Sequence, residues 1–434
     1  MLLFLRKSIH VLIQPGRVED VDILLQQAIQ YSWDSFFATY NYYFHFIPRL
    51  VTIVSLSVLG IANAPLGMNL DAIIIAALCA VFFATRQFRF IIRNDLLRAL
   101  CSLFIVIVPG VGDIYSNISA IQWFLNIFLM LFVTLLLFNY SEYEKKSRKK
   151  KYLYAFFCSM SFLSSAFSVI FLPVLIYVII REFRRNKKKI FTISSYVIST
   201  ILLLVQTLTI YFTYSQQFKS PVLDVTNDVI TSSVNGFTII ATRIFYHDNN
   251  TVFQHFGEWM YLIPLAIIAF VILNSIKMKT KLEIYTLVLA TETLFWSSIL
   301  RRSMLDWTCL CGGMGDDARF FFFTAVFLFI LIVRQLDKIK SLIFKFIFLS
   351  LIVVMILNTA PGFFIQSSAD ENWKYVTKLY DPTGMYKCYV GEVPHGWALT
   401  IPCSIPASTN MTISSSTVST GSGPSITFTP PVQP

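Results

Sequence analysis

Long apolar segments recur from residue 46 to residue 359, separated by short polar or basic stretches. Most of them approach the roughly 20 residues that an α-helix needs to cross the hydrocarbon core of a bilayer. The pattern predicts about ten such segments, at residues 46–64, 70–88, 97–112, 120–139, 152–181, 190–213, 258–276, 282–300, 319–335 and 340–359. The apolar runs are continuous rather than alternating, which favours helices over the strands of a membrane β-barrel. We therefore expect an all-α polytopic membrane protein.

The segment at 152–181 differs from the others because basic clusters flank it at both ends. A single crossing would place one of these clusters on the outer side, against the positive-inside rule. The centre of the segment, Ser159–Ser165, is rich in serine, and Pro173 follows it. We therefore predict a short helical hairpin that enters and leaves from the cytoplasm. Protein or water must satisfy the backbone at its turn.

Basic clusters also orient the second half of the chain. The short loops rich in lysine and arginine are expected in the cytoplasm, at Lys145–Lys151, Arg181–Lys189, Lys277–Lys281 and Arg334–Lys340. Residues 214–257, residues 302–318 and the chain from residue 360 then lie on the outer face. In the first half, the basic stretch Arg86–Arg98 favours the cytoplasm and conflicts with an external placement of the first 45 residues. The topology of residues 1–120 therefore stays open.

The composition agrees with a membrane protein. Of the 434 residues, 56% are hydrophobic and only 14% are charged, which is too few charges to cover a soluble protein of this size. The net charge of +11 comes largely from residues beside apolar segments, where they determine topology. We therefore expect a lipid bilayer as a partner and no nucleic acid.

Four regions follow from these patterns. Residues 1–45 form an amphipathic region that resembles an external loop, and residues 46–359 form the transmembrane domain. Residues 360–403 contain few long apolar runs and are predicted to be a small β-rich, extracytoplasmic appendage. Residues 404–434 are rich in serine, threonine and proline, and are expected to be disordered.

The first candidate chemical group is the acidic pair Asp20 and Asp22, within a predicted amphipathic helix at 17–37. Acidic residues are common in the first turn of a helix, where they interact with its dipole. A carboxylate there can also serve as a general base for an acceptor hydroxyl, or as a metal ligand.

Polar and aromatic residues also gather where two apolar segments begin. His45 and Arg49 lie in an aromatic-rich stretch at the start of the first segment, where Arg49 can extend toward the interface or pair with a phosphate. Asn117 precedes the segment at 120–139 and Trp123 lies near its start, where polar residues serve either as helix caps or, with the Trp ring, as a surface for binding sugar. Clustered aromatic residues at these positions are also typical of a membrane-interface belt.

The loop between two late segments carries the densest charge. Arg302 and Arg319 can bind an anionic lipid phosphate there, while Asp316 and Asp317 can hold a divalent cation or orient the arginines. The alternative is a solvated loop with internal ion pairs. Trp397 lies in the predicted outer appendage, where it can contribute to acceptor binding.

Several short patterns resemble those of GT-C glycosyltransferases, and they spread over most of the chain. They are Tyr43-Phe44-His45…Pro48-Arg49, Asn117…Gln122-Trp123, the serine-rich hairpin ending near Pro173, Ala318-Arg319-Phe320-Phe321, and Trp373 with Gly396-Trp397. Phage-type O-antigen glucosyltransferases are also similar in length and layout. The resemblance implies a polyprenyl-phosphate-linked sugar donor, transfer on the extracytoplasmic face and an essential acidic residue in the first external loop. In that family a transmembrane helix precedes this loop, whereas residues 1–14 are short and charged.

The leading hypothesis is therefore a membrane glycosyltransferase in a bacterial inner membrane, with its C-terminus outside. It would move sugar from a polyprenyl-phosphate carrier to a surface glycan or another extracytoplasmic acceptor, with Asp20 or Asp22 as base. The cofactor is left open, a divalent cation being one candidate. The alternatives are a transporter or flippase of a polar lipid or glycan, and a non-catalytic subunit of an envelope complex.

Overall fold

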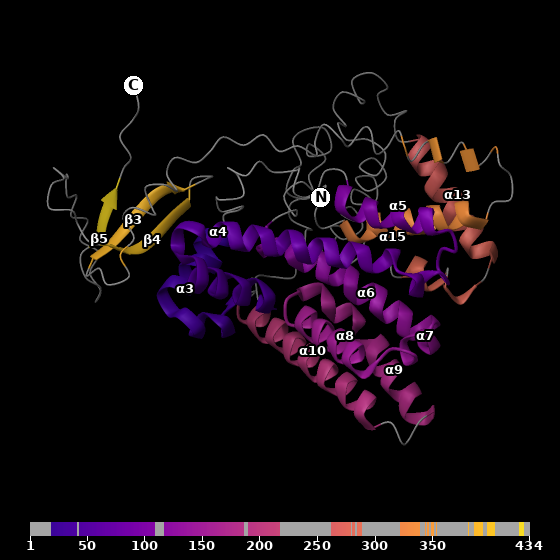
Figure 1. The fold of residues 1–434 in the computed structure, drawn as a ribbon, viewed down its shortest axis with the longest axis horizontal. Coiled ribbons are helices and arrows are strands. Elements are labelled where there is room, and N and C mark those ends of the chain that lie inside the picture. The colour runs from indigo at the N-terminus through magenta and orange to yellow at the C-terminus, as the bar shows by residue number, and fades with distance from the viewer. Residues whose placement is uncertain are drawn as a thin grey trace. The chain divides into compact units, whose positions relative to one another are not determined.

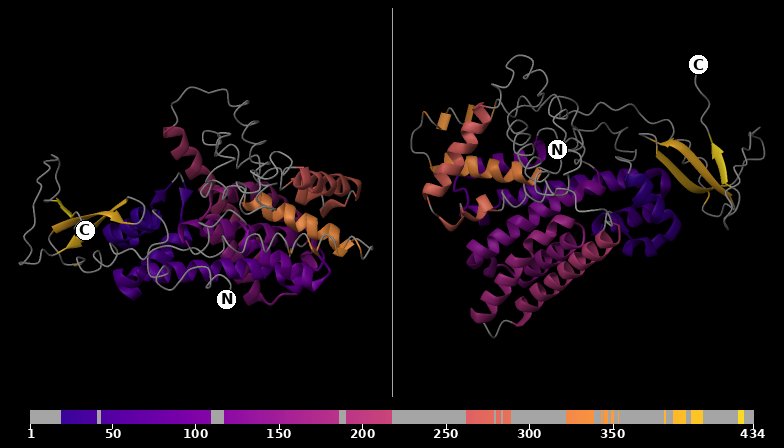
Figure 2. Two further views of the ribbon diagram at one scale, coloured as in Figure 1. Left: turned by 90° about the horizontal axis from the view of Figure 1, so that it is seen from above. Right: turned by 180° about the vertical axis from the view of Figure 1, so that it is seen from behind.

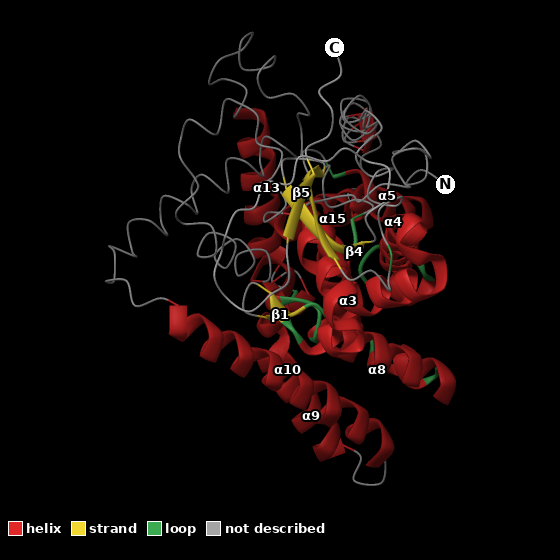
Figure 3. Cartoon of the chain, turned by 90° about the vertical axis from the view of Figure 1, so that its left-hand side faces the viewer, coloured by secondary structure: helices red, strands yellow, loops and turns green. Residues whose placement is uncertain are grey.

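The computed structural model is mostly helical (Figure 1). The long stretches that the structure describes are residues 19–40, 43–108, 117–185, 190–217, 262–278 and 322–338. The shorter ones are residues 280–282, 284–288, 343, 345–346, 349–350, 353, 381, 386–393, 397–403 and 425–428. Helix predominates among them, as Figure 3 shows.

The chain divides into two compact units, which are described separately. The first unit comprises Met1–Ile74, Ser116–Ile121 and Gln366–Pro434. The second comprises Ile75–Tyr115 and Gln122–Ile365. Residues far apart in sequence are therefore brought together within each unit.

The first unit begins with three short helical pieces followed by a small β-hairpin. These elements are the π-helical turn η1 (Glu19–Leu25), α3 (Gln26–Tyr31), the 3-10 helix η2 (Ser32–Phe37), β1 (Thr39–Tyr40) and β2 (Tyr43–Phe44). Leu24, Leu25 and Ala28 are buried at helical spacing, which explains why this amphipathic stretch folds as helix. The described part of the predicted helix at 17–37, residues 19–37, is thus helical but divided into three pieces.

The helix α4 (Phe46–Ala84) contains two of the predicted apolar segments, 46–64 and 70–88, except for the last residues of the second. It does not run straight, because Gly60 has non-helical torsion angles with φ at 69°. Gly67 lies so close to Ser55 that a Cβ on Gly67 would be 2.6 Å from the Ser55 hydroxyl oxygen. On a straight helix these residues would be about 18 Å apart, so the chain bends back at Gly60. The predicted break at residues 65–69 is wrong, because the helix continues through Pro65.

The second unit is a set of packed helices. They are η3 (Arg86–Phe88), α5 (Asp95–Ile107), α6 (Gln122–Phe138), α7 (Tyr140–Glu144), α8 (Arg148–Phe162), η6 (Ala166–Phe171), α9 (Leu172–Arg185), α10 (Ile190–Gln217), α13 (Leu262–Met278) and α15 (Phe322–Lys338). Figures 1 and 2 show α6, α8, α9 and α10 side by side, and α6 and α10 each contact both α8 and α9. The helix α15 packs against α5, α6 and α13.

The core of the second unit is apolar and aromatic. Every side chain from Trp123 to Leu136 in α6 is buried, as is every one from Phe322 to Leu336 in α15. The rings of Phe104 and Phe329 stack with their centroids 3.8 Å apart. Such aromatic pairs add to the free energy gained by burial.

The chain between α8 and α9 breaks at Leu163–Ser165, within the serine-rich centre where a turn is predicted. Serine hydroxyls satisfy the backbone at this break. Ser164 donates to the carbonyl of Met160 at 2.7 Å, and Ser168 donates to the carbonyl of Ser165 at 2.6 Å. Pro173 occupies the first turn of α9, where proline removes no helical hydrogen bond.

Among the described residues, two helical stretches are long and apolar enough to cross a bilayer, Phe46–Ala84 and Ser119–Phe138. This is fewer than the ten predicted segments. One reason is that α4 combines two of them, and another is that α5, with 13 residues, and α13 and α15, with 17 each, fall short of a full crossing. Most of the predicted segments at 282–300 and 340–359 lies outside the described residues.

Three strands near the C-terminus form a sheet in the order β4-β3-β5. They are β3 (Tyr386–Val393), β4 (Trp397–Cys403) and β5 (Ser425–Phe428). The pair β3 and β4 is antiparallel, with Cys388 opposite Ile401, and β5 adds in parallel to β3. The strand β5 lies within residues 404–434, a range in which no regular structure was expected.

Candidate functional site

Asp20 is the first candidate residue that the structure places in a defined contact. It lies in η1 and is 1% exposed, and its Oδ1 accepts a hydrogen bond of 2.9 Å from the backbone N–H of Ser119. Ser119 begins the 3-10 helix η5 (Ser119–Ile121), and the first N–H groups of a helix lack partners within it. The carboxylate therefore caps a helix start, which is also where the helix dipole favours negative charge.

The same contact brings a second candidate beside the first. Asn117 is buried two residues before Ser119, and its carbonyl accepts a hydrogen bond from the N–H of Ala120. Asp20 and the Asn117 stretch therefore meet in the first unit, although about a hundred residues separate them. The sequence pattern indicates each residue as a candidate, but it does not predict their proximity.

Arg49 is the most unusual residue of the first unit. It lies in the first turn of α4 and is 1% exposed, and its Nη1 donates to Oε1 of Gln27 at 2.7 Å. Within the described part of the chain, neither Nε nor Nη2 of this side chain has a hydrogen-bond partner. A buried cation with unsatisfied donors is costly unless an anion binds it.

His45 lies directly before α4 and is 2% exposed. The ring of Tyr43 packs on it with centroids 4.2 Å apart. The pKa of His45 is lowered to about 3, first by burial and then by the positive charge of Arg49, while the nearby backbone of Tyr40 acts in the opposite direction. His45 is therefore neutral at neutral pH and can donate or accept one hydrogen bond.

Gln27 connects Arg49 to the helical stretch that carries Asp20. Residues 20 and 27 are seven positions apart, which is about two helical turns or roughly 10 Å along the axis. The carboxylate of Asp20 and the guanidinium of Arg49 thus belong to one unit and reach the same short helical stretch. We define the polar core of the first unit as Asp20, Gln27, His45, Arg49 and Asn117.

Buried arginines of the second unit show how Arg49 differs. Arg98 is 2% exposed, and it donates to the Asp95 carboxylate at 2.8 Å and to the carbonyls of Ala84 and Ile92. Arg334 likewise donates to backbone carbonyls of the loop before α5. These arginines fix that loop in place, whereas Arg49 keeps donors without partners among the described residues.

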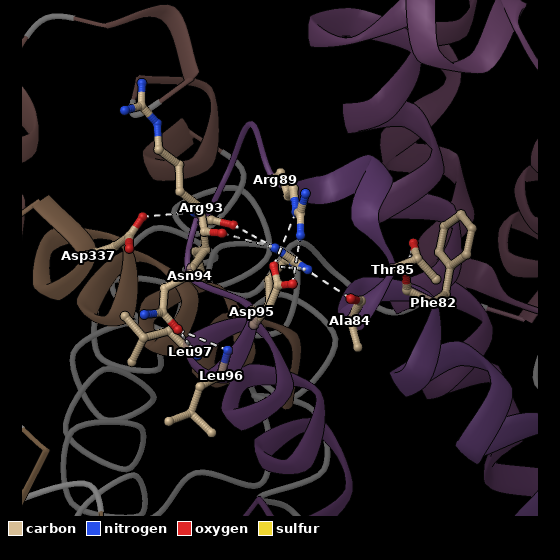
Figure 4. A network of polar contacts seen from close by, with 12 residues as sticks. Phe82, Ala84, Thr85, Arg89, Arg93, Asn94, Asp95, Leu96, Leu97 and Asp337 are labelled. Atoms are coloured by element: carbon tan, nitrogen blue, oxygen red, sulfur yellow. Dashed lines mark hydrogen bonds and ion pairs between the residues drawn. The ribbon is translucent and has the colours of Figure 1, made fainter.

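Asp95 sits at the centre of this loop network, which Figure 4 shows. Its carboxylate accepts hydrogen bonds from Arg89 at 2.7 Å and 3.1 Å, in addition to the one from Arg98. These hydrogen bonds, with Arg89 contributing most, lower the pKa of Asp95 to about 2. Asp337 of α15 accepts the backbone N–H of Arg93 at 2.8 Å. The role of this network is structural.

The other sequence candidates fall elsewhere. Trp123 belongs to the second unit, where it is buried against Phe167 and Phe323 at centroid distances of 5.1 Å and 5.2 Å. Its neighbours make it a packing residue rather than an open platform for sugar. Asp22 lies in η1 and Trp397 begins β4. The remaining candidates, Arg302, Asp316, Asp317 and Arg319, lie outside the described residues.

Sequence reasoning missed Gln27 and Ser119. Gln27 is a polar residue between Leu25 and Ala28, and this interruption of an apolar stretch is the one signal that could have identified it. Ser119 contributes a backbone N–H, which no side-chain pattern reveals. Within the described stretches, no group of three or more His, Cys, Asp and Glu residues could hold a metal ion. The divalent cation stays a prediction about the loop at 302–318.

Comparisons with protein families, with curated proteins and with solved structures find no match to this chain. The functional argument therefore depends on the polar core itself.

Proposed function

We propose that the protein is a polytopic membrane glycosyltransferase that moves a sugar from a polyprenyl-phosphate-linked donor to an extracytoplasmic acceptor. One observation carries the proposal. The Ser119 N–H holds the buried carboxylate of Asp20 in the unit in which Arg49 keeps donors without partners among the described residues. A carboxylate and an anion-binding guanidinium in one unit are the groups that such a transfer requires.

In the proposed reaction, Asp20 accepts the proton of the acceptor hydroxyl. The acceptor oxygen then bonds to the anomeric carbon of the sugar, and the bond from that carbon to the phosphate oxygen breaks. The electron pair leaves with the polyprenyl phosphate, whose charge is stabilised by Nε and Nη2 of Arg49, the two donors that have no partner in the described part of the chain. Neutral His45, beside Arg49, can donate one further hydrogen bond to the phosphate.

The membrane setting rests on exposed apolar residues as well as on helix length. Large apolar side chains are exposed along α10, including Val197, Ile201, Leu204, Leu208 and Phe212. A continuous apolar stripe of this kind is unusual on a protein surface that faces water. It supports a lipid-facing side of α10, and the membrane that we propose for this multi-pass protein is the bacterial inner membrane.

The finer topology belongs to the same proposal. About ten apolar segments would cross or enter the bilayer, and the basic loops would face the cytoplasm. The sheet β3–β5, with Trp397, would lie outside and help to bind the glycan acceptor. Arg302, Arg319, Asp316 and Asp317 would lie on the same outer face, where the two aspartates would bind a divalent cation.

A second candidate function, translocation of a polar lipid or glycan, is favoured by one observation in the second unit. Asn126 is 2% exposed, its side-chain nitrogen donates to the Ser165 hydroxyl at the break between α8 and α9, and its Oδ1 has no partner in the described stretches. Broken helices with buried polar groups are common at transporter binding sites.

A reconstitution experiment separates the two functions. Purified protein in liposomes is given a polyprenyl-phosphate-linked sugar, and both sugar transfer and lipid translocation are followed. The transferase proposal predicts transfer by the wild type and a lower kcat in Arg49→Gln, because the leaving phosphate loses the cation that stabilises its charge. Transfer should be unchanged in Gln30→Glu, a change at an exposed residue of α3. Translocation without transfer would instead establish the second function.

A further inference from the structure

Exposed, positively charged side chains cluster beside α7, at the start of α8 and near the end of α9, on the side that the charge pattern predicts to face the cytoplasm. The first turn of α8 contains Arg148, Lys149 and Lys150, all exposed, and Arg184 is exposed near the end of α9. We define the basic end as Lys145, Lys146, Arg148, Lys149, Lys150 and Arg184. The acidic residue Glu142 forms an ion pair with Lys145 at 2.6 Å, which leaves the cations of α8 and α9 to dominate the charge of this surface.

Contacts show that the two helices bring their basic ends to the same side. Arg181 of α9 donates to the carbonyls of Leu136 and Leu137 at the end of α6, and its guanidinium lies 5.6 Å from the ring of Tyr140. Lys151 of α8 lies 5.6 Å from the ring of Tyr143 in the same α7. The start of α8 and the end of α9 therefore meet at α7.

Exposed apolar residues continue directly from these cations. On α8, Tyr152, Leu153 and Phe156 are each about half exposed and lie on the face of Lys149 at i+3, i+4 and i+7. On α9, Tyr177 and Ile180 are exposed and share a face with Arg184. Each helix thus passes from exposed cations to exposed hydrocarbon along one face, in opposite chain directions.

From this arrangement we propose that the basic end binds the headgroups of anionic phospholipids. Phosphate groups would lie against Lys149, Lys150 and Arg184, while the acyl chains would lie along Tyr152, Phe156 and Ile180. A soluble polyanion would satisfy the cations but would leave the apolar faces in water, so charge and hydrocarbon together favour a lipid. The proposal is independent of any transferase activity.

The experiment uses the purified full chain in mixed micelles of equal phosphatidylglycerol and phosphatidylcholine. The protein is purified again, and the retained lipids are quantified by mass spectrometry. The wild type is expected to retain phosphatidylglycerol in excess over phosphatidylcholine. In the triple variant Lys149→Gln, Lys150→Gln, Arg184→Gln this enrichment is expected to fall at least fivefold. Fivefold is about the effect of a single basic residue at an anionic membrane surface.

Two further variants control for charge and folding. Arg86→Gln, Arg93→Gln, Lys277→Gln removes three exposed cations elsewhere in the second unit and should keep the enrichment. Lys149→Arg, Lys150→Arg retains the charge and should behave as the wild type, with an unchanged thermal midpoint. Equal loss in both triple variants, or no loss in either, would overturn the proposal. Full displacement by soluble glycerol phosphate would show that the surface binds phosphate alone and would overturn it as well.

Discussion

The backbone N–H of Ser119 donates a hydrogen bond of 2.9 Å to Oδ1 of Asp20, and both residues are buried. The contact has two separable consequences. It stabilises a helix start, and it holds a carboxylate in the unit that contains His45 and Arg49. Stability measurements test the first consequence, and transfer kinetics test the second.

Asp20→Ala is expected to lower the free energy of unfolding by about 1–3 kcal/mol, because the buried N–H of Ser119 loses its acceptor. Asp20→Asn should be nearly as stable as the wild type, since its amide oxygen can accept the same hydrogen bond. Thermal unfolding of the purified protein measures both. Asp34→Ala, at an exposed aspartate of η2, is the matched control. An Asp20→Ala variant as stable as this control would contradict the capping role.

Gly67→Ala is expected to destabilise the protein by roughly 1–3 kcal/mol, because its Cβ would lie 2.6 Å from Ser55 Oγ and 3.0 Å from Ser55 Cβ. On an uncrowded helix the same change would stabilise by up to about 1 kcal/mol, so the sign of the effect is informative. Adding Ser55→Ala should restore part of the loss, while Ser57→Ala, at an exposed position, should restore none. Stabilisation by Gly67→Ala alone would mean that the chain does not bend back at Gly60.

Protonation of His45 should destabilise the fold in acid. Its folded pKa of about 3 lies below the ordinary value of 6.5, so the unfolded chain binds a proton that the folded one excludes. The contribution of neutral His45 to the free energy of unfolding is fully present above pH 6.5. It declines by about 1.4 kcal/mol for each pH unit as the pH falls toward 3. His45→Gln should weaken the pH dependence of the thermal unfolding midpoint between pH 4 and pH 6.5. An equally steep dependence in that variant would argue against burial of the imidazole.

Asp95 should produce a separate loss of stability at lower pH. Its folded pKa of about 2 lies below the ordinary value of 3.8, so its contribution is present above pH 3.8 and is lost as the pH falls toward 2. The change Asp95→Asn should remove this dependence and weaken the loop before α5, because Arg98 loses its acidic partner. Unfolding midpoints between pH 2 and pH 4 measure the effect, with Asp34→Asn as control. If Asp95→Asn retained the wild-type dependence of the midpoint on pH, as the Asp34→Asn control should, the network would not act through Asp95.

Local patterns in the sequence predict part of this fold. The apolar run at 120–139 becomes the helical stretch Ser119–Phe138, and the serine-rich centre of 152–181 becomes the break before Ser165. In both places the local sequence determines the structure, through continuous hydrophobicity in one and hydroxyls that satisfy a broken backbone in the other.

Other features depend on tertiary context that the local pattern does not contain. Gly60 and Gly67 both look like ordinary residues of an apolar segment, yet one reverses the chain and the other makes room for Ser55. The pairing of Asp20 with Ser119 joins stretches 99 residues apart through a backbone donor. The sequence thus identified Asp20, His45, Arg49 and Asn117 as candidates, but it could not show that they share a unit.

The most direct test of the proposed function is the kcat of sugar transfer from a polyprenyl-phosphate donor by Asp20→Asn. This change keeps the hydrogen bond from Ser119 and removes the base. We predict a fall in kcat of about 100-fold or more, with the donor KM and the thermal midpoint close to those of the wild type. A kcat within a factor of two of the wild type would contradict the assignment of Asp20 as the catalytic base.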